Sequence, residues 1–186
     1  RSPRLGEVKR RLAEAVGDEA ALVAHETLLR RTLDRCVGVD GYDPELWLTE
    51  VGRLEQHDFS RSRLALCEQT GGDLGARMNQ ALERGVRAGA GTVLIGCDCP
   101  DIDGRYVRRA FAELEHADVV VGPAEDGGYG LIGLRKPVPA LFTGMPWGTA
   151  EVLQTTLVRA ADAGVGVTLL EEIYDVDTEA DWQRFQ

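Results

Sequence analysis

The sequence predicts an α/β fold, a single domain whose mostly parallel sheet is flanked by helices. Short apolar runs of strand length alternate with longer segments of helical periodicity along most of the chain, an order typical of parallel sheets with crossover helices. The runs at 92–97 and 118–122 end close to acids and glycines, where sheets of this kind bind ligands. The 186 residues contain no low-complexity tract and no long linker, so one domain accounts for the whole sequence.

The individual elements follow from local periodicity. In the segment 19–36, Leu22, Leu28, Leu29 and Leu33 recur at spacings that build one apolar face, which predicts an amphipathic helix. The same reasoning predicts further helices at 6–16, 74–88, 104–115, 149–163 and 179–185. Short apolar segments predict strands at 45–49, 63–67, 92–97, 118–122, 130–134 and 167–170. We expect the strand at 130–134 to run antiparallel to its neighbours.

Composition argues against several classes of protein. With 44% hydrophobic residues the chain can bury a substantial core, so we expect no extensive disorder. The formal net charge of -10 repels polyanions, which argues against nucleic-acid binding but not against a small anionic ligand held through a metal ion. No apolar stretch reaches the roughly 18 residues of a membrane span. The four cysteines lack zinc or disulfide spacing, so we expect reduced thiols and a cytoplasmic location.

The segment 92–101 carries the clearest chemical signal. The apolar run from Thr92 suits a strand buried on both faces, and Pro100 cannot continue the ladder, so we place Asp98 at the strand's carboxyl end. A carboxylate there suits Mg²⁺ or Mn²⁺, ions that usually accompany the phosphates of a nucleotide. The alternative is that Asp98 only caps the following turn or helix.

Two other segments suit a phosphorylated ligand. At the amino terminus a turn with glycine opens a basic helix, where backbone N–H groups attract phosphate and Lys9 and Arg11 add positive charge. The alternative is a solvated basic helix face. The glycines of the turn 69–75 permit close approach of a ligand. Arg77 is the better contact candidate there, because Asp73 fits the N-cap of the next helix.

Acidic residues also follow two later strand candidates. Asp126 comes after the strand at 118–122 and before glycines, which suggests a second site carboxylate, although a simple Asp-Gly turn explains it equally well. Asp175 and Asp177 are two residues apart in an extended segment, so their side chains are expected to point the same way. If this segment returns to Asp98, one divalent ion can be held between them.

Six motifs occur in order along nearly the whole chain: Gly6-x-Val8-Lys9-x-Arg11-Leu12, Gly72-Asp73-Leu74-Gly75-x-Arg77-Met78, Gly96-x-Asp98-Cys99-Pro100-Asp101, Glu125-Asp126-Gly127-Gly128-Tyr129, Pro146-Trp147-x-Thr149 and Tyr174-Asp175-Val176-Asp177-Thr178. Together they resemble the glycosyltransferase-like proteins of the arsenosugar-biosynthesis type. The wider superfamily has the glycosyltransferase-A fold of nucleotide-diphospho-sugar transferases, and nucleotidyltransferases with similar elements share that fold.

The resemblance implies a Rossmann-like glycosyltransferase-A domain with a hydrophobic strand before Arg1, so we expect the natural chain to be longer. The sequence departs from the family pattern at Arg10, Gly130, Gly148 and Ala150.

The resemblance further implies a metal-dependent transferase with a nucleotide-activated donor, foremost a nucleotide-sugar glycosyltransferase with a small-molecule acceptor. Asp98 would hold Mg²⁺ or Mn²⁺ with help from Asp101, Asp175 and Asp177. Asp126 would orient the acceptor or the sugar, or act as general base. The substrate-binding residues would be Lys9, Arg11, Gly71, Gly72, Asp73, Gly75, Arg77, Gly127, Gly128, Tyr129, Trp147 and Thr149.

Two other functions stay open at this point. A nucleotidyltransferase that releases pyrophosphate from an NTP is favoured by the sequence Asp98-Cys99-Pro100, which is closer to such enzymes than a simple Asp-x-Asp. The other is a nucleotide-sugar-binding protein without turnover. For Trp147, a core or lid position is as reasonable as stacking on a sugar, because aromatic side chains dominate burial in any fold.

Overall fold

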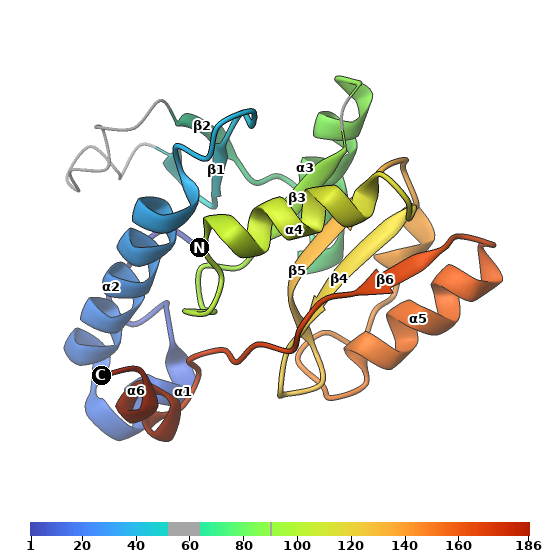
Figure 1. Cartoon of the computed structure of the whole chain (residues 1–186). Coiled ribbons are helices and arrows are strands. Elements are labelled where there is room, and N and C mark those ends of the chain that lie inside the picture. Colours follow the sequence, from blue (N-terminus) through green and yellow to red (C-terminus); the bar gives the residue numbers. More distant parts are fainter. Residues whose placement is uncertain (52–63, 90) are drawn as a thin grey trace. The chain divides into compact units, whose positions relative to one another are not determined.

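The computed structural model describes residues 1–51, 64–89 and 91–186 (Figure 1). They form two compact units. Unit 1 comprises Arg1–Gln69, Cys97–Gly104 and Asp175–Gln186, and unit 2 comprises Thr70–Gly96 and Arg105–Tyr174. The expectation of a single domain stays a prediction.

Unit 2 is built on a four-stranded mixed sheet. Its strands are β3 (Thr92–Ile95), β4 (Val119–Pro123), β5 (Tyr129–Leu134) and β6 (Val167–Leu169), in the order β3-β5-β4-β6. β5 pairs antiparallel with both β3 and β4, whereas β4 and β6 are parallel. Strands β3, β4 and β6 therefore run in one direction and β5 alone runs against them. This confirms the α/β class and the antiparallel strand expected near 130–134.

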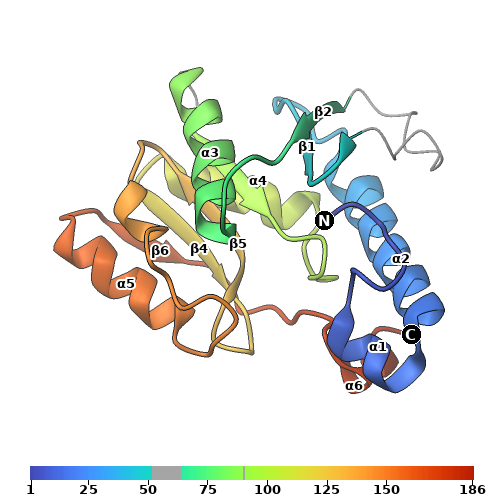
Figure 2. The same ribbon diagram turned by 180° about the vertical axis from the view of Figure 1, so that it is seen from behind.

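Helices cover both faces of this sheet (Figures 1 and 2). On one face lie α3 (Leu74–Arg87) and α5 (Val152–Asp162), together with the short 3-10 helix η2 (Pro139–Leu141). Their side chains share one core with Val119 and Val121 of β4. On the other face lies α4 (Gly104–Leu114). The glycines of β4 and β5 admit it, because a Cβ at Gly122 would lie 2.6 Å from the Tyr106 hydroxyl.

In its described residues, unit 1 combines three helices with a separate pair of parallel strands. The helices are α1 (Arg10–Val16), α2 (Asp18–Cys36) and α6 (Glu179–Phe185), and the strands are β1 (Glu45–Leu48) and β2 (Ala65–Glu68). Gly17 separates α1 from α2 at a positive φ of 85°, a conformation that glycine adopts without steric cost. Leu12 of α1 and two alanines of α2 form a small core, against which Trp182 of α6 packs. The chain's two ends therefore meet in one unit.

Most element boundaries lie within a few residues of those predicted from the sequence. The clearest correction is the first helix, which begins at Arg10 and not at residue 6, because Lys9 has the left-handed conformation that interrupts a helix. The strand predicted at 63–67 is β2, and Arg63 lies outside the described residues. Within the described ranges, no helix is both long enough and apolar enough to span a membrane.

Candidate active site

Lys9 has an unusual backbone conformation and an unusually buried ammonium group. Its φ of 47° and ψ of 48° make it the one non-glycine residue with positive φ in the described part of the chain. Such a conformation is sparsely populated for residues with a Cβ, and it persists only where surrounding contacts fix it. Only 3% of its side chain is exposed, and Nζ lies 2.8 Å from Oδ1 of Asp98. Nζ also donates to the carbonyl of Val176.

Asp98 lies in the loop that follows β3, as the sequence predicted. Its backbone carbonyl accepts a hydrogen bond of 2.9 Å from the Val176 N–H. Three segments that are distant in the sequence are thus tied together at Lys9, Asp98 and Val176. The Asp98 side chain is 44% exposed, so the carboxylate that meets a buried ammonium is also open to solvent.

The charge state of Asp98 follows from these contacts. Desolvation alone would raise the pKa of this carboxyl group, but the charge and the hydrogen bond of Lys9 act in the opposite direction, and His25 adds to them. The resulting pKa lies below the ordinary value, so Asp98 is ionised at neutral pH. An ionised, half-exposed carboxylate is a suitable ligand for a hard divalent cation.

A histidine that sequence reasoning missed lies beside this carboxylate. Ligand atoms of His25, Cys97 and Asp98 all lie within 4.8 Å of one another, and they form the one such group of three or more in the described ranges. Burial lowers the pKa of His25, although Asp98 opposes this effect. Burial and then Asp98 raise the pKa of the Cys97 thiol to about 12, so that at neutral pH it is protonated. No motif connects His25 with residues more than 70 positions away, so only the fold reveals this proximity.

The other predicted metal ligands are arranged differently. Asp177 receives a 3.0 Å hydrogen bond from Arg11 in a largely exposed ion pair. Asp175 lies close enough to Cys99 to contribute to its raised pKa, after the larger effects of burial and Asp98. Asp101 is exposed. Among the described residues these three carboxylates do not join Asp98 in a group of ligand distance, so their part in metal binding stays a prediction.

In unit 2, the glycine-rich turn before α3 has local structural roles. Asp73 caps the helix, since its side chain accepts a 2.7 Å hydrogen bond from the Ala76 N–H. Gly75 packs so closely that a Cβ would lie 2.3 Å from the carbonyl oxygen of Phe142. Gly71 has a φ of 121°, whereas a Cβ at Gly72 would meet nothing within 4 Å.

Arg77 of α3 differs from the residues of this turn, because its side chain is available to a ligand. In the part of the chain that the structure describes, Arg77 is half-buried and has no hydrogen-bond or ion-pair partner. A cation without a protein partner is available to an anionic ligand. This placement is compatible with the predicted contact.

The acid and glycines after β4 also form a turn. Oδ1 of Asp126 accepts a 2.8 Å hydrogen bond from the Gly128 N–H, and Asp126 is exposed. Gly127 has a φ of 85°, and a Cβ there would lie 2.4 Å from the carbonyl oxygen of Ala150. The turn thus explains both glycines structurally. The carboxylate of Asp126 is solvent-accessible, and its catalytic role stays a prediction.

The predicted aromatic residues of unit 2 pack into its core. Tyr129 and Trp147 meet edge to face at 6.3 Å between ring centroids, and both lie against the core of the sheet. Among the described residues, the buried Trp147 indole N–H has no hydrogen-bond partner. Thr149 accepts from the Glu151 N–H at 3.3 Å and donates to the Pro146 carbonyl at 2.9 Å, in a turn before α5.

Comparisons with known proteins agree with this architecture. The family described as "Uncharacterized protein conserved in bacteria (DUF2064)" matches residues 32–149. A solved structure described as "putative nucleotide-diphospho-sugar transferase" from Desulfovibrio desulfuricans G20 is similar at 33% sequence identity and a TM-score of 0.86. That similarity covers 98% of this chain and 81% of the other. No curated protein sequence matches the chain.

Two mycobacterial structures are more distant. The Rv0371c homolog from Mycobacterium sp. strain JC1 is 22% identical with a TM-score of 0.53, and the match covers 85% of this chain and 80% of that one. It supports the fold alone. Rv0371c from Mycobacterium tuberculosis H37Rv, in complex with manganese, is 19% identical with a TM-score of 0.48 over 84% of each chain. So weak a similarity carries no argument about a metal in this chain.

Proposed function

We propose a metal-dependent transferase activity on a nucleotide-activated donor for this chain, which belongs to the bacterial protein family DUF2064. The foremost candidate is the transfer of a sugar from a nucleotide sugar to a small-molecule acceptor. The similarity to the Desulfovibrio structure supports a nucleotide-diphospho-sugar transferase fold. The transfer reaction itself is what we propose. The resemblance to the arsenosugar-biosynthesis type of these proteins stays a prediction.

The observation that carries the proposal is the ion pair between Lys9 and Asp98. Lys9 is buried, has a strained backbone and lies 2.8 Å from an ionised, half-exposed carboxylate. Desolvating its ammonium group and holding this backbone conformation both cost free energy, which a purely structural contact seldom requires. A diphosphate ligand with its divalent cation provides a counterpart for each group. The carboxylate suits the cation, and the ammonium suits phosphate oxygens.

At neutral pH Asp98 offers an ionised oxygen ligand, the kind of donor that a hard cation such as Mg²⁺ or Mn²⁺ prefers. Asp98 would hold the cation, and Asp175 and Asp177 would assist from the same unit. A divalent cation bound there would neutralise negative charge on the departing nucleotide.

The basic residues at the start of α1 would bind the phosphates. Lys9 would exchange part of its contact with Asp98 for a phosphate oxygen, and its burial excludes water from that contact. Arg11 is 64% exposed, so its guanidinium can leave Asp177 at small cost and add two parallel hydrogen bonds to phosphate.

For unit 2 we propose substrate contacts that the sequence predicted and that its geometry permits. Arg77 would bind an anionic part of a ligand, and Gly71 and Gly72 would allow its close approach. Asp126 would accept a proton from an acceptor hydroxyl or orient the sugar, since its carboxylate is exposed beyond its turn hydrogen bond.

A nucleotidyltransferase is the second candidate, and one observation favours it. The sequence Asp98-Cys99-Pro100 is closer to such enzymes than a simple Asp-x-Asp, and the Pro100 carbonyl accepts hydrogen bonds from two arginines of α2. Here an acceptor phosphate would attack the α-phosphorus of an NTP, the bond to the β-phosphate oxygen would break, and pyrophosphate would leave.

Calorimetric titration measures whether the protein binds a nucleotide donor with Mn²⁺, as both candidate reactions require. We would titrate three proteins with nucleoside triphosphates and with nucleotide sugars, each with and without Mn²⁺. The proteins are wild type, Asp98→Asn and the control Asp40→Asn, which changes an exposed aspartate after α2. We expect one donor class to bind only with Mn²⁺, equally in wild type and Asp40→Asn, and more weakly in Asp98→Asn.

Product analysis then separates the candidates. Release of nucleoside diphosphate from a nucleotide sugar supports the glycosyltransferase, and pyrophosphate from an NTP supports the nucleotidyltransferase. Binding that persists without turnover for every acceptor offered supports a non-catalytic binding protein. Absence of any Mn²⁺-dependent binding would refute both enzyme proposals.

A further inference from the structure

The loop that carries Asp98 is held against one face of α2. This Asp98 loop, residues 97–103, is contacted by side chains at positions 31, 32, 35 and 36. These positions share one helix face, because 32, 35 and 36 follow residue 31 by one, four and five residues. Nη1 of Arg35 donates to the carbonyl of Pro100 at 3.0 Å, and Nε of Arg31 reaches the same oxygen at 3.5 Å. One carbonyl thus accepts from two cations.

Both ends of the Asp98 loop are anchored as well. Near its start, the Thr32 hydroxyl lies 3.4 Å from the Cys97 carbonyl, although its nearer acceptor is the Leu28 carbonyl at 3.0 Å. Near its end, Nη2 of Arg35 lies 3.8 Å from Oδ2 of Asp103. The guanidinium of Arg35 therefore contacts both the Pro100 carbonyl and the Asp103 carboxylate, through different nitrogens. The ammonium group of a lysine is a single point charge and does not bridge two such groups.

The chemistry of Pro100 explains why this anchor matters. Proline has no N–H, so its carbonyl is the one backbone group of residue 100 that can form a hydrogen bond. A hydrogen bond from a charged donor is about twice as strong as one between neutral groups. The two arginines thereby hold the backbone two residues after Asp98, in addition to the hydrogen bond from the Val176 N–H to the Asp98 carbonyl.

Arg31 connects the same loop to α6. Its guanidinium carbon lies 5.3 Å from the centre of the Phe185 ring, in a cation–π contact, and Phe185 stacks on Trp182 at 5.2 Å. Immediately before α6 comes the segment with Asp175 and Asp177. A single arginine thus contacts the loop of Asp98 and the helix that follows the other predicted carboxylates.

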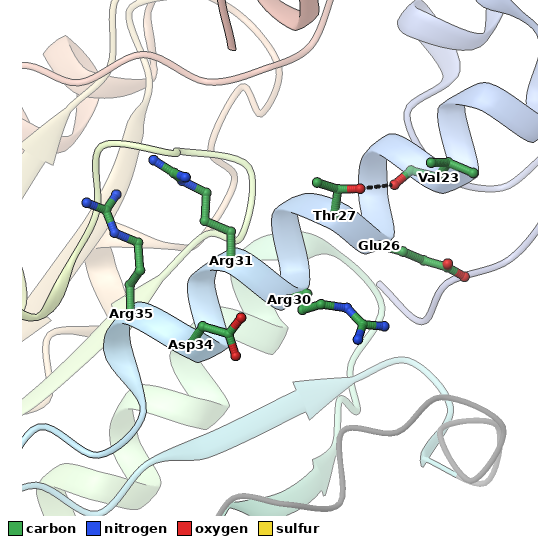
Figure 3. Close-up of a pocket in the computed structure, with 7 residues that line it drawn as sticks. All are labelled: Val23, Glu26, Thr27, Arg30, Arg31, Asp34 and Arg35. Carbon is green, nitrogen blue, oxygen red and sulfur yellow. Dashed lines mark hydrogen bonds between the residues drawn. The ribbon is translucent and has the colours of Figure 1, made fainter. Parts of the chain in front are cut away.

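The arginines of α2 differ in direction. A shallow groove runs along the helix and is lined by Val23, Glu26, Thr27, Arg30, Arg31, Asp34 and Arg35. Figure 3 shows Arg31 and Arg35 extending to one side of the helix, whereas Arg30 extends to another. Arg30 therefore offers a matched control on the same helix.

We propose that Arg35, assisted by Arg31, is a positioning residue that orients Asp98 through the Pro100 carbonyl. The proposal rests on the proposed function, because the role of Asp98 is to hold a cation with its nucleotide. Neither arginine touches the substrate in this account. Their effect on the reaction passes through the conformation of the Asp98 loop.

The test compares Arg35→Met, Arg35→Lys and Arg30→Met with wild-type protein in two measurements. Hydrogen–deuterium exchange of the loop amides is recorded without metal, and Mn²⁺-dependent donor binding is recorded by calorimetry. Loss of a charge-assisted hydrogen bond corresponds to a roughly tenfold or larger effect. We expect Arg35→Met to raise exchange in 97–103 and to weaken Mn²⁺-dependent binding by about that factor, with exchange elsewhere unchanged.

Arg35→Lys keeps the charge but cannot bridge Pro100 and Asp103, so an intermediate effect is expected, and Arg30→Met should match wild type. Unchanged exchange in the loop of folded Arg35→Met would overturn the proposal, as would an equal effect of Arg30→Met. If Arg35→Met fails to fold, Arg31→Met and Arg35→Lys decide the question by the same criteria. If wild-type protein binds no metal with any donor, the proposed function fails, and loop exchange still reports whether Arg35 fixes the loop.

Discussion

The two units of the molecule use their acidic residues in different ways. In unit 1, Asp98 interacts with Lys9 and Val176, which are separated from it by many tens of residues. In unit 2, Asp73 and Asp126 each accept a hydrogen bond from a backbone N–H two or three residues ahead. Each of these aspartates follows a strand in the sequence and has glycine or proline within two residues, so the two kinds look alike in the sequence.

This difference separates a structural explanation from a functional one. A cap or turn hydrogen bond explains why an aspartate occurs at its position, because it satisfies a backbone donor that otherwise has no partner. Nothing local explains the pair of Lys9 and Asp98, which requires a buried ammonium and a strained backbone. We therefore propose that the chemical centre lies on unit 1, and Asp73 serves first as the cap of α3.

Replacing Lys9 by Met has the largest expected effect and acts directly on this distinction. Without the ammonium, a phosphate ligand loses a charge-assisted partner, and we expect donor affinity in the presence of Mn²⁺ to fall about 10- to 100-fold. Mn²⁺ alone should bind more tightly than to wild type, because Asp98 no longer has a competing cation. Calorimetry measures both, and equal losses with and without the donor would contradict the assignment of Lys9 to phosphate.

The glycines of unit 2 test the structural side. A Cβ at Gly75 would collide with the Phe142 carbonyl, whereas one at Gly72 would meet nothing. Gly75→Ala should therefore destabilise the protein by about 1–3 kcal/mol, the usual cost of overpacking, and Gly72→Ala should be close to neutral. Urea unfolding of both variants gives the comparison. Equal stability of the two would show that Gly75 is not fixed by packing.

The cap at Asp73 provides a smaller and sharper test. Asp73→Ala should lower the free energy of unfolding by about 1 kcal/mol, because the Ala76 N–H loses its acceptor, and Asp73→Ser should retain most of it. Donor binding is then measured on the stable Asp73→Ser variant. A clear loss of affinity there would make Asp73 a ligand contact in addition to a cap.

The smallest expected effect concerns Asp118, a carboxylate with a purely structural environment. Hydrogen bonds from Arg135, and then Lys136, lower its pKa to about 2. Because this pKa lies below the unfolded value of about 4, its stabilisation is present above pH 4 and is lost as the pH falls toward 2. The difference in melting temperature between wild type and Asp118→Asn should shrink over that interval, and a constant difference would contradict the ion pairing.

The sequence was sufficient for much of the fold because periodicity and turn residues act locally. The apolar repeat at 19–36 corresponds to α2 at Asp18–Cys36, and the expected antiparallel strand is β5. The start of α1 was missed because the left-handed conformation of Lys9 is imposed by contacts with residues 98 and 176, which no local pattern contains.

The site was predictable only in part for the same reason. Asp98 was recognised from its place after a strand, and its partner Lys9 was recognised separately as a phosphate contact. The proximity of His25 and the anchoring of Pro100 by α2 depend on tertiary packing, and neither residue type nor spacing encodes them. The glycines at 71–75 and 127–128 were recognised as special, yet most of their geometry serves turns and close packing.

The most direct test of a metal centre at Asp98 is a Mn²⁺ titration of Asp98→Asn beside Asp126→Asn. Bound Mn²⁺ is followed by electron paramagnetic resonance in the presence of the donor that binds wild type. Each variant removes one negative charge from a carboxylate that follows a strand. The account predicts that Asp98→Asn loses the bound Mn²⁺ signal and that Asp126→Asn keeps it. Retention of bound Mn²⁺ by Asp98→Asn, or its loss in Asp126→Asn alone, would contradict the assignment of the metal centre to unit 1.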